Sequence, residues 1–240
     1  MDPRTTPITG STLATVTPPA TELAAGDVLP GFLVSIDGPS GVGKTTCSKR
    51  LYDLLSQHGL PAIRTTQPSD SPIGVLARSG THQFHGLALT CLVAADRYHH
   101  IASVIEPRLQ AGHVVLCDRY VPSAFVLDRL DGASEEFITG LYRHARPADL
   151  AIFLLGEPEA CLRRARARGG YSRFHHDHLA AAHHECALFA EVAERSRAAG
   201  TPTLIHHIGD DEADTVAAVL ARHITAAITA RAHPLLPHQR

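Results

Sequence analysis

Gly38-Pro39-Ser40-Gly41-Val42-Gly43-Lys44-Thr45 is the stretch of this sequence that decides the fold. It matches the phosphate-binding P-loop pattern G-x-x-x-x-G-K-[ST] at every fixed position. The apolar run before it predicts a buried strand, and Thr46–Leu51 after it predict the start of a helix. In that setting backbone N–H groups cradle phosphate oxygens, and the helix N-terminus adds a favourable dipole. We therefore expect a nucleoside triphosphate to bind at Gly38, Pro39, Ser40, Gly41, Val42, Gly43, Lys44, Thr45 and Thr46.

Two side chains of this motif have specific expected roles. Lys44 is expected to reach the outer phosphates, and the Thr45 hydroxyl is expected to bind Mg²⁺. A glycine-rich turn that matches the pattern by chance is the alternative, but the strand before it and the helix after it favour the phosphate site.

Composition sets the broad class. A chain of 240 residues with 44% hydrophobic content can bury one sizeable core, so one domain is expected. The net charge of -2 and the lack of a Lys/Arg block argue against a nucleic-acid partner. No apolar run approaches the ~20 residues of a membrane span. The N-terminus does not show the charged segment followed by an apolar segment that is typical of a signal peptide. Five cysteines without a C-x-x-C predict small buried residues in a reducing compartment, so we expect a cytoplasmic protein with no membrane partner.

Strand-like and helical patterns alternate along the chain. This alternation predicts an α/β protein with a five-stranded parallel sheet flanked by helices on both faces. The expected strands are Leu33–Asp37, Ala62–Thr66, Val114–Asp118, Leu150–Leu155 and Thr203–Ile208. The expected helices are Thr45–His58, Leu87–Ala111, Glu135–Arg143, Pro158–Arg168, His178–Ala199 and Ala213–Ala230. We expect the domain to span 28–231, between a flexible extension at 1–27 and a flexible tail at 232–240.

A second chemical signal lies at the end of the strand at 114–118. Asp118 is placed where P-loop enzymes hold Mg²⁺, directly or through water. Arg119 beside it has the bidentate fork that grips an acceptor phosphate. A carboxylate that only caps the next segment is the alternative, and the P-loop elsewhere in the chain favours the metal role.

Five arginines form a third signal around Gly169-Gly170: Arg163, Arg164, Arg166, Arg168 and Arg173. Arg164 and Arg168 are four residues apart and share a helix face. Arginines on a closing lid neutralise the charge that spreads over a transferring phosphoryl group and exclude water. The alternative is an exposed basic helix face, which fits most of the five individually.

These motifs together resemble the thymidylate kinase family of nucleoside-monophosphate kinases from about Leu33 to Ile224. Ala94-Ala95-Asp96-Arg97 is similar to the family's A-x-D-R helix, Asp118-Arg119-Tyr120 to its D-R-[YH] strand end, and Arg168-Gly169 with Arg173-Phe174 to its lid. The resemblance implies a P-loop kinase fold with an arginine-containing lid, ATP with Mg²⁺ as donor, a nucleoside monophosphate as acceptor, and a homodimer. It implies that Lys44, Asp118, Arg119, Arg164, Arg168 and Arg173 are catalytic, and that Thr45 and Asp118 hold the metal.

The acceptor half departs from the family pattern. The substrate-binding positions implied by the resemblance are Asp37, Gln67, Val93, Arg97, Arg119, Ser123 and Leu127. Gln67 follows the second strand where the family has a carboxylate, and no arginine precedes it. Val93 stands where the family stacks an aromatic ring on thymine. Leu127 and Asp128 occupy the positions of a tyrosine and a glutamine.

The sequence therefore predicts phosphoryl transfer from ATP to a nucleoside monophosphate that resembles dTMP or is a modified nucleotide, giving the diphosphate. Gln67 cannot accept a proton, which disfavours a free nucleoside as acceptor. A kinase of a nucleoside or of another phosphorylated metabolite, and a catalytically silent nucleotide-binding regulator, remain the alternatives. A P-loop GTPase is disfavoured because the chain has no N-K-x-D motif.

Overall fold

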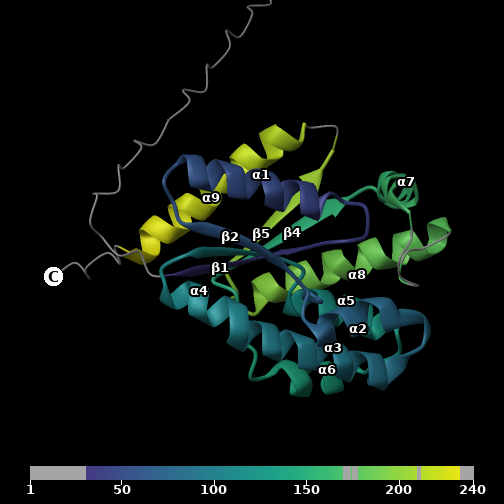
Figure 1. Ribbon diagram of the computed structural model, residues 1–240. Coiled ribbons are helices and arrows are strands. Elements are labelled where there is room, and N and C mark those ends of the chain that lie inside the picture. The colour runs from purple at the N-terminus through teal and green to yellow at the C-terminus, as the bar shows by residue number, and fades with distance from the viewer. Residues whose placement is uncertain (1–30, 170–173, 175–177, 210–211, 233–240) are drawn as a thin grey trace, which may run out of the picture.

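The computed structural model describes residues 31–169, 174, 178–209 and 212–232, shown in Figure 1. The predicted extension at 1–27 lies outside these residues, as does the predicted tail except for Ala232. The predicted domain bounds therefore stay a prediction. No helix in the described parts of the chain is long and apolar enough to cross a membrane.

A five-stranded sheet forms the centre of the molecule, with the order β2-β3-β1-β4-β5 and every neighbouring pair parallel. This confirms the predicted sheet. The strands are β1 (Phe32–Asp37), β2 (Ala62–Thr66), β3 (Val114–Asp118), β4 (Leu150–Gly156) and β5 (Thr203–Ile208). Because β1 has neighbours on both sides, the loop after it lies near the middle of the carboxyl edge of the sheet, where ligands of open α/β sheets bind.

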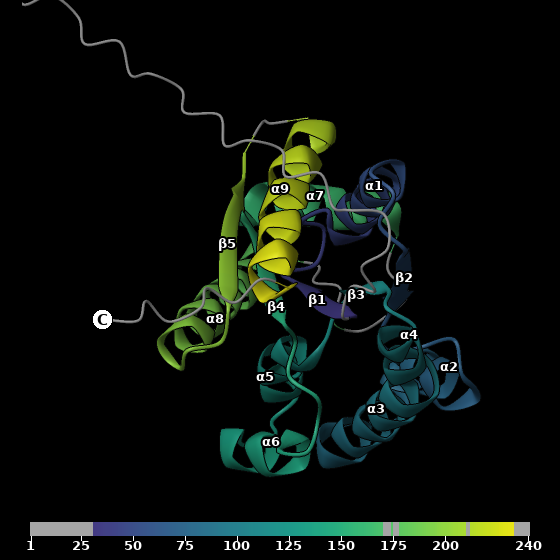
Figure 2. The ribbon, with the colours of Figure 1, turned by 90° about the vertical axis from the view of Figure 1, so that its left-hand side faces the viewer.

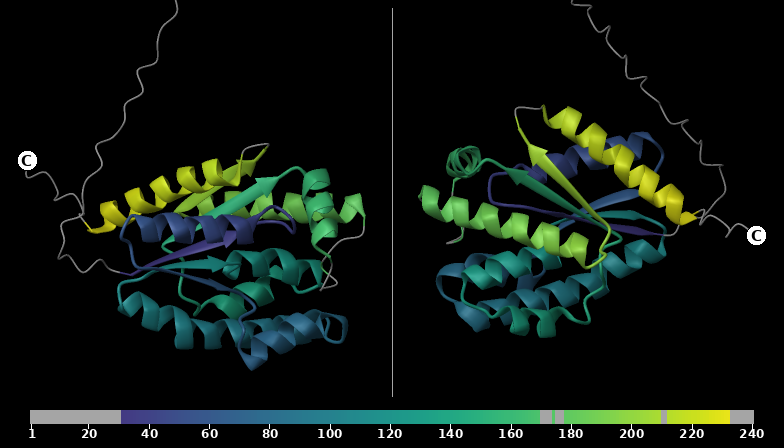
Figure 3. Two further views of the ribbon diagram at one scale, coloured as in Figure 1. Left: turned by 45° about the horizontal axis from the view of Figure 1, so that its top comes forward. Right: turned by 180° about the vertical axis from the view of Figure 1, so that it is seen from behind.

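Helices cover both faces of the sheet, as predicted (Figures 2 and 3). One face carries α1 (Lys44–Gln57) and α9 (Ala213–Ala232), which pack side by side. The helices packed on the other face include α4 (Glu106–Gln110), α5 (Val121–Leu130) and α8 (Leu179–Ala198). The remaining helices are α2 (Pro72–Ser79), α3 (Gly86–His100), α6 (Glu135–Tyr142) and α7 (Pro158–Arg168).

Strand β1 shows why helices cover both faces of the sheet. Phe32, Val34 and Ile36 belong to the core shared with α1 and α9. Leu33 belongs to the core on the opposite face, with Ile105 before α4. Side chains alternate along a strand, so an apolar run that is buried at every position needs apolar partners on both faces.

The predicted helix at 87–111 is divided in the structure. After α3, residues Ile101–Ile105 form one π-helical turn before α4 begins. Pro107, in the first turn of α4, has no N–H to donate to the preceding turn, so the regular hydrogen-bond ladder cannot run through it.

Two α-helices and the short 3-10 helix Gly80–His82 were not predicted from the sequence. In α2 the Ser71 side chain accepts a hydrogen bond from Gly74 N, and a proline lies in the first turn. This serine–proline start is a helix signal that the prediction missed. Helix α5 also has a proline in its first turn, and it begins at Val121, directly after its N-cap residue Tyr120, which follows Asp118-Arg119.

The prediction that the cysteines are all buried was wrong for two of the five. Cys47, Cys117 and Cys161 are buried, but Cys91 is exposed on α3 and Cys186 is half-buried. All five are free thiols.

Candidate active site

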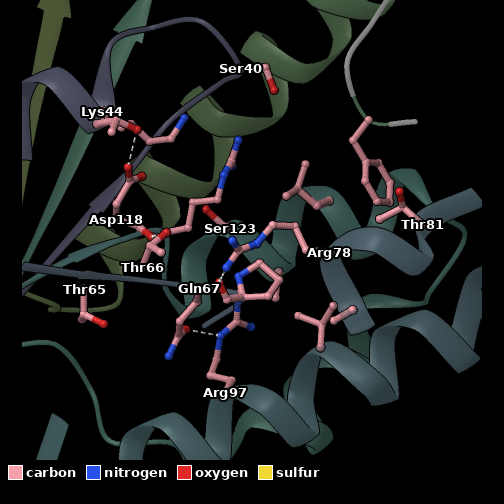
Figure 4. Close-up of a pocket in the computed structure, with 18 of the residues that line it drawn as sticks. Ser40, Lys44, Thr65, Thr66, Gln67, Arg78, Thr81, Arg97, Asp118 and Ser123 are labelled. Carbon is pink, nitrogen blue, oxygen red and sulfur yellow. Dashed lines mark hydrogen bonds between the residues drawn. The ribbon is translucent and has the colours of Figure 1, made fainter. Parts of the chain in front are cut away.

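A cavity of about 940 Å³ opens at the carboxyl ends of β1, β2 and β3 (Figure 4). Its walls come from the P-loop, the segment after β2, helices α2, α3, α5 and α7, and Phe174. The predicted site residues that line it are Ser40, Gly41, Gly43, Lys44, Thr45, Thr46, Gln67, Val93, Arg97, Asp118, Arg119, Ser123, Leu127, Arg164 and Arg168. Arg173 lies outside the described residues.

The P-loop leaves the N-terminus of α1 open. Gly43 caps the helix with a left-handed backbone (φ 109°), and no side chain hydrogen-bonds to the first turn. Gly41 also has a positive φ of 79°, and a Cβ there would lie 2.0 Å from the carbonyl oxygen of Cys161 on α7. The first N–H groups of α1 are therefore available to a phosphate, which fits the predicted donor site.

Lys44 lies buried in this loop. Its Nζ donates hydrogen bonds to the carbonyl oxygens of Gly38 and Pro39, each at 2.8 Å. Burial, followed by the nearby Arg119 charge, lowers the pKa of Lys44 from 10.5 to about 7. A phosphate beside Nζ would supply the negative charge that this ammonium lacks.

Two oxygens of the cavity are placed to hold a cation. The Thr45 hydroxyl donates to Oδ2 of Asp118 at 2.7 Å, joining the first residues of α1 to the end of β3. Hydroxyl and carboxylate oxygens are the donors that Mg²⁺ prefers. The described residues contain no cluster of three or more His, Cys, Asp or Glu able to hold a metal, so a bound Mg²⁺ would take its other ligands from phosphate and water.

Arg119 has a strained backbone. Its φ is 68°, the only positive value among the described non-glycine residues, and its N–H donates to the carbonyl of Ile36 at 2.9 Å. One guanidinium nitrogen, Nη1, is buried without a hydrogen-bond partner in the described structure. Strain of this kind concentrates at functional sites, and a buried donor beside the P-loop fits an anionic ligand.

Asp37 does not line the cavity, although the family resemblance implied a substrate contact. Its carboxylate is fully buried, and Oδ1 accepts hydrogen bonds from the backbone N–H groups of Tyr120 and Ser123 and from the Ser123 hydroxyl. Asp37 therefore fixes the turn that leads into α5 and acts on the ligand site through Ser123. Gly38, Pro39 and Val42 also fall outside the cavity lining, and the Val42 side chain packs in the core.

A chain of hydrogen bonds orders the far end of the cavity, where Figure 4 shows Arg97 reaching from α3 toward Gln67. Arg97 Nε donates to Gln67 Oε1 at 2.6 Å, so the amide nitrogen of Gln67 faces His100 Nδ1 at 3.0 Å. His100 Nδ1 must therefore accept this hydrogen bond. The proton of the neutral imidazole is then on Nε2, which lies 2.6 Å from the Thr65 hydroxyl oxygen. Burial lowers the pKa of His100, consistent with this neutral form.

Arg97 and Asp128 are buried charges at this end. The guanidinium of Arg97 lies 4.7 Å from the centre of the Tyr142 ring, and its Nη1 has no hydrogen-bond partner among the described residues. Asp128 of α5 also lines the cavity, and its Oδ2 is equally unpartnered. Burial raises the pKa of Asp128 from 3.8 to about 7, although the Arg97 charge opposes the shift.

Asp96 and Arg78 hold the segment after β2 in place, a role that the sequence did not reveal. Asp96 is fully buried and accepts hydrogen bonds from Ser69 N, Ser69 Oγ and Ser71 Oγ, which fixes the segment after β2. Arg78 of α2 donates to the carbonyls of Pro68 and Ser69 and lines the cavity. It restores a guanidinium to the region where the family's arginine is missing. The unpredicted helix α2 is the reason it was missed.

The arginine-rich helix α7 presents two of its side chains to the cavity. All four arginines of α7 are exposed, and of these Arg164 and Arg168 line the cavity while Arg163 and Arg166 do not. Arg163 and Arg166 therefore fit the alternative of an exposed basic helix face, and a lid role for Arg164 and Arg168 stays a prediction. On the neighbouring helix α8, buried Glu185 accepts hydrogen bonds from the backbone N–H and hydroxyl of Ser40, which ties the P-loop to that helix.

The parallel sheet, the P-loop between β1 and α1, and the carboxylate at the end of β3 together define a P-loop kinase fold. Comparison with known proteins narrows this class. A family model described as thymidylate kinase matches residues 36–197, and the chain belongs to the thymidylate kinase family, which is a family of phosphotransferases.

Individual relatives agree with this assignment. The chain is 34% identical to a probable thymidylate kinase of Pyrococcus abyssi over 152 residues, which cover 60% of this chain and 74% of the relative. It is 34% identical to the thymidylate kinase of Caulobacter vibrioides over 174 residues, or 69% of this chain and 84% of the relative. It is 32% identical to a probable thymidylate kinase of Caldivirga maquilingensis over 142 residues, or 58% of this chain and 69% of the relative.

Proposed function

We propose that this protein transfers the γ-phosphoryl group of ATP to a nucleoside monophosphate and so forms the diphosphate, with Mg²⁺ as cofactor. One observation carries this proposal: the P-loop and the Arg97 end open into the same cavity. A donor held by its phosphates at Lys44 and an acceptor held by its base near Arg97 would then meet between these two ends. Holding two reactants in line accounts for much of phosphoryl-transfer catalysis.

Arginine side chains supply positive charge where the two phosphates would meet. Arg119 lines the cavity with an unpartnered donor, and Arg164 and Arg168 line it from α7. Charge on the transferring group spreads over its oxygens in the transition state, so positive groups preorganised around it lower the barrier. Mg²⁺ held by Thr45 and Asp118 would add neutralising charge to the donor phosphates.

The contacts of Gln67, the residue after β2, favour a phosphate group over a free sugar hydroxyl as the acceptor. Both polar atoms of the Gln67 amide are engaged, by Arg97 and by His100. Gln67 can neither accept a proton nor turn toward a sugar hydroxyl without breaking this chain. A phosphomonoester is already an anion, so it needs positioning and charge neutralisation more than a general base.

An acceptor panel tests the proposal. Purified protein with Mg·ATP is incubated with deoxynucleoside and nucleoside monophosphates, with free nucleosides, and with non-nucleotide phosphates. We expect diphosphate formation from at least one monophosphate and loss of transfer, by at least about a hundredfold, in Lys44→Ala.

Other outcomes would replace the proposal. If only free nucleosides react, the protein is a nucleoside kinase, and if only non-nucleotide phosphates react, it serves another metabolite. Stoichiometric ATP binding without turnover on any acceptor would instead make it a nucleotide-binding regulator. Unchanged transfer in Lys44→Ala would contradict the assigned donor site. The homodimer and the cytoplasmic location stay predictions.

A further inference from the structure

The far end of the cavity holds two buried polar groups that the fold does not satisfy. Arg97 is 3% exposed and Asp128 is 6% exposed, and both line the cavity. Arg97 Nη1 lacks an acceptor, and Asp128 Oδ2 lacks a donor, in the part of the chain that the structure describes. Unpaired buried groups cost free energy, so each requires an explanation.

The Gln67 amide is already paired and cannot satisfy these two atoms, while the Tyr142 hydroxyl near Arg97 is itself buried without a partner among the described residues. Gln67 is committed to Arg97 Nε and to His100. No ion pair joins Arg97 to Asp128 within the described residues, although their opposite charges influence one another. A donor and an acceptor, each buried on a residue that lines the cavity, therefore remain unpartnered among the described residues.

Apolar side chains form the nearby wall. Val93 of α3 and Ala124 and Leu127 of α5 line the cavity and offer no hydrogen bond. In such a setting the few polar groups decide which ligand edge fits, because a wrongly matched edge leaves a buried polar atom unpaired.

We propose that Asp128 and Arg97 recognise the base of the acceptor nucleotide and select a base that carries an exocyclic amino group. This inference rests on the proposed function and names its substrate class. The amino group would donate to Asp128 Oδ2, while a ring nitrogen or carbonyl of the same base would accept from Arg97 Nη1.

The ionised Asp128 side chain accepts hydrogen bonds but cannot donate them, which disfavours thymine and uracil as bases of the acceptor. Their pairing edge presents one N–H between two carbonyl oxygens, so a carboxylate that accepts from the N–H brings its second oxygen against a carbonyl. An amide at this position would supply a donor for that carbonyl, whereas an ionised carboxylate has none. The family's glutamine is replaced here by a carboxyl group, which only accepts hydrogen bonds when it is ionised.

The protonation of Asp128 gives this selectivity an expected pH dependence. Burial raises its pKa to about 7. Three groups from the surrounding elements act on it: the Arg97 cation of α3 lowers this pKa, the Asp131 carboxylate at the end of α5 raises it, and the Tyr142 phenol of α6 lies within electrostatic reach. A protonated Asp128 regains a donor, so discrimination against thymine should weaken below pH 7 and strengthen above it.

The test compares transfer from Mg·ATP to dCMP, dAMP, dGMP and dTMP by wild type, Asp128→Asn and Asp131→Asn. Asp131 lies three residues away, does not line the cavity, and bonds to Gly86 N through an oxygen that asparagine retains. We expect kcat/KM for the best amino-bearing acceptor to exceed that for dTMP by at least about tenfold at pH 8. Asp128→Asn should reduce this ratio by about tenfold and Asp131→Asn should not, and only Asp128→Asn should abolish its rise between pH 6 and pH 8.

Three results would overturn the inference. One is a wild-type preference for dTMP at pH 8. Another is the same base preference in Asp128→Asn as in wild type, with acceptor binding by calorimetry and thermal unfolding showing that the variant is folded. A third is an equal change in both variants, which would assign the effect to net charge. If no monophosphate accepts phosphate at all, the proposed function fails and this inference fails with it.

Discussion

At the scale of single residues, buried ionisable groups lie at both ends of the cavity. Lys44 stands at the donor end, and Arg97 and Asp128 stand at the other. Moving a charged group out of water costs free energy. A shifted pKa that favours the neutral form reduces this cost, and so does a bound ligand of opposite charge. The pH dependence of binding and stability therefore reports on these residues directly.

Lys44 should take up a proton when a nucleotide binds. Its pKa of about 7 in the free protein leaves the amine mostly neutral at pH 8, and a bound phosphate favours the ammonium form. Calorimetric titration with ATP in two buffers of different ionisation enthalpy should show proton uptake at pH 8 and less at pH 6. The Lys44→Met variant should show none, and equal heats in both buffers at pH 8 would contradict the assignment.

Asp128 should make the protein less stable as pH rises from about 4 to about 7. The unfolded carboxyl loses its proton near its ordinary pKa of 3.8, while the folded one keeps it to about 7, so the folded state binds more protons in this window. Asp128→Asn should raise the free energy of unfolding at pH 8 by on the order of 2–4 kcal/mol and have a smaller effect at pH 5. Urea unfolding at both pH values measures this, and an equal effect at both would argue against the shifted pKa.

The sequence predicted some of these residues better than others. Lys44, Thr45 and Asp118 were placed from a local motif and a strand end, because their geometry is set within a few residues. The roles of Asp96, Arg78 and Asp128 depend on contacts between segments far apart in the chain, such as Ser69 N with Asp96 across 27 positions. No local pattern marks such contacts.

Close packing between loops and helices fixes the site at the scale of elements. The P-loop touches α7 at Gly41 and is tied to α8 through Ser40 and Glu185. The segment after β2 is held to α3 by Asp96. These two segments of the cavity wall are therefore positioned by helices that are distant in sequence.

Gly41→Ala should disrupt the donor site. The added Cβ would meet the Cys161 carbonyl at 2.0 Å, and the positive φ of 79° disfavours any side chain. We expect ATP affinity to fall by at least about tenfold, together with a loss of stability of about 1–3 kcal/mol. Gly140→Ala is the matched control, because that glycine lies exposed within α6 with nothing within 4 Å of an added Cβ, and it should be neutral or stabilising. Similar losses in both variants would rule out the P-loop contact as the cause.

Asp96→Ala should loosen the segment after β2. It would leave the Ser69 N–H and two hydroxyls without their acceptor, at an expected cost of about 3 kcal/mol in unfolding free energy. Hydrogen exchange should accelerate at Ser69–Ser71, and the KM for the acceptor should rise more than the KM for ATP. The control is Asp53→Ala, which removes an exposed carboxylate. Unchanged hydrogen exchange at Ser69 in Asp96→Ala would contradict the role of Asp96 in holding this segment.

Strands were predicted more accurately than helices. Three of the expected strands, Ala62–Thr66, Val114–Asp118 and Thr203–Ile208, have the same bounds in the structure. Of these, β3 is a fully buried apolar run, whereas β2 and β5 are the edge strands of the sheet and are only partly buried. The two missed α-helices, α2 and α5, are 8 and 10 residues long and each begins with a proline in its first turn, so they resemble loops.

The topology of the sheet joins the two ends of the site at the scale of the whole molecule. With the order β2-β3-β1-β4-β5, the P-loop after β1 lies next to Asp118 at the end of β3, and Gln67 follows at the end of β2. Donor and acceptor groups that are far apart in sequence therefore reach one cavity. This shared cavity is the central claim about the protein.

Calorimetric binding of a compound in which adenosine and cytidine are joined through a polyphosphate chain tests that claim most directly. One cavity that accommodates both nucleotides predicts an affinity at least about a hundredfold tighter than that of ATP alone, reduced by Lys44→Ala and also by Arg97→Ala. Binding no tighter than that of ATP, or an affinity that Arg97→Ala leaves unchanged, would contradict it.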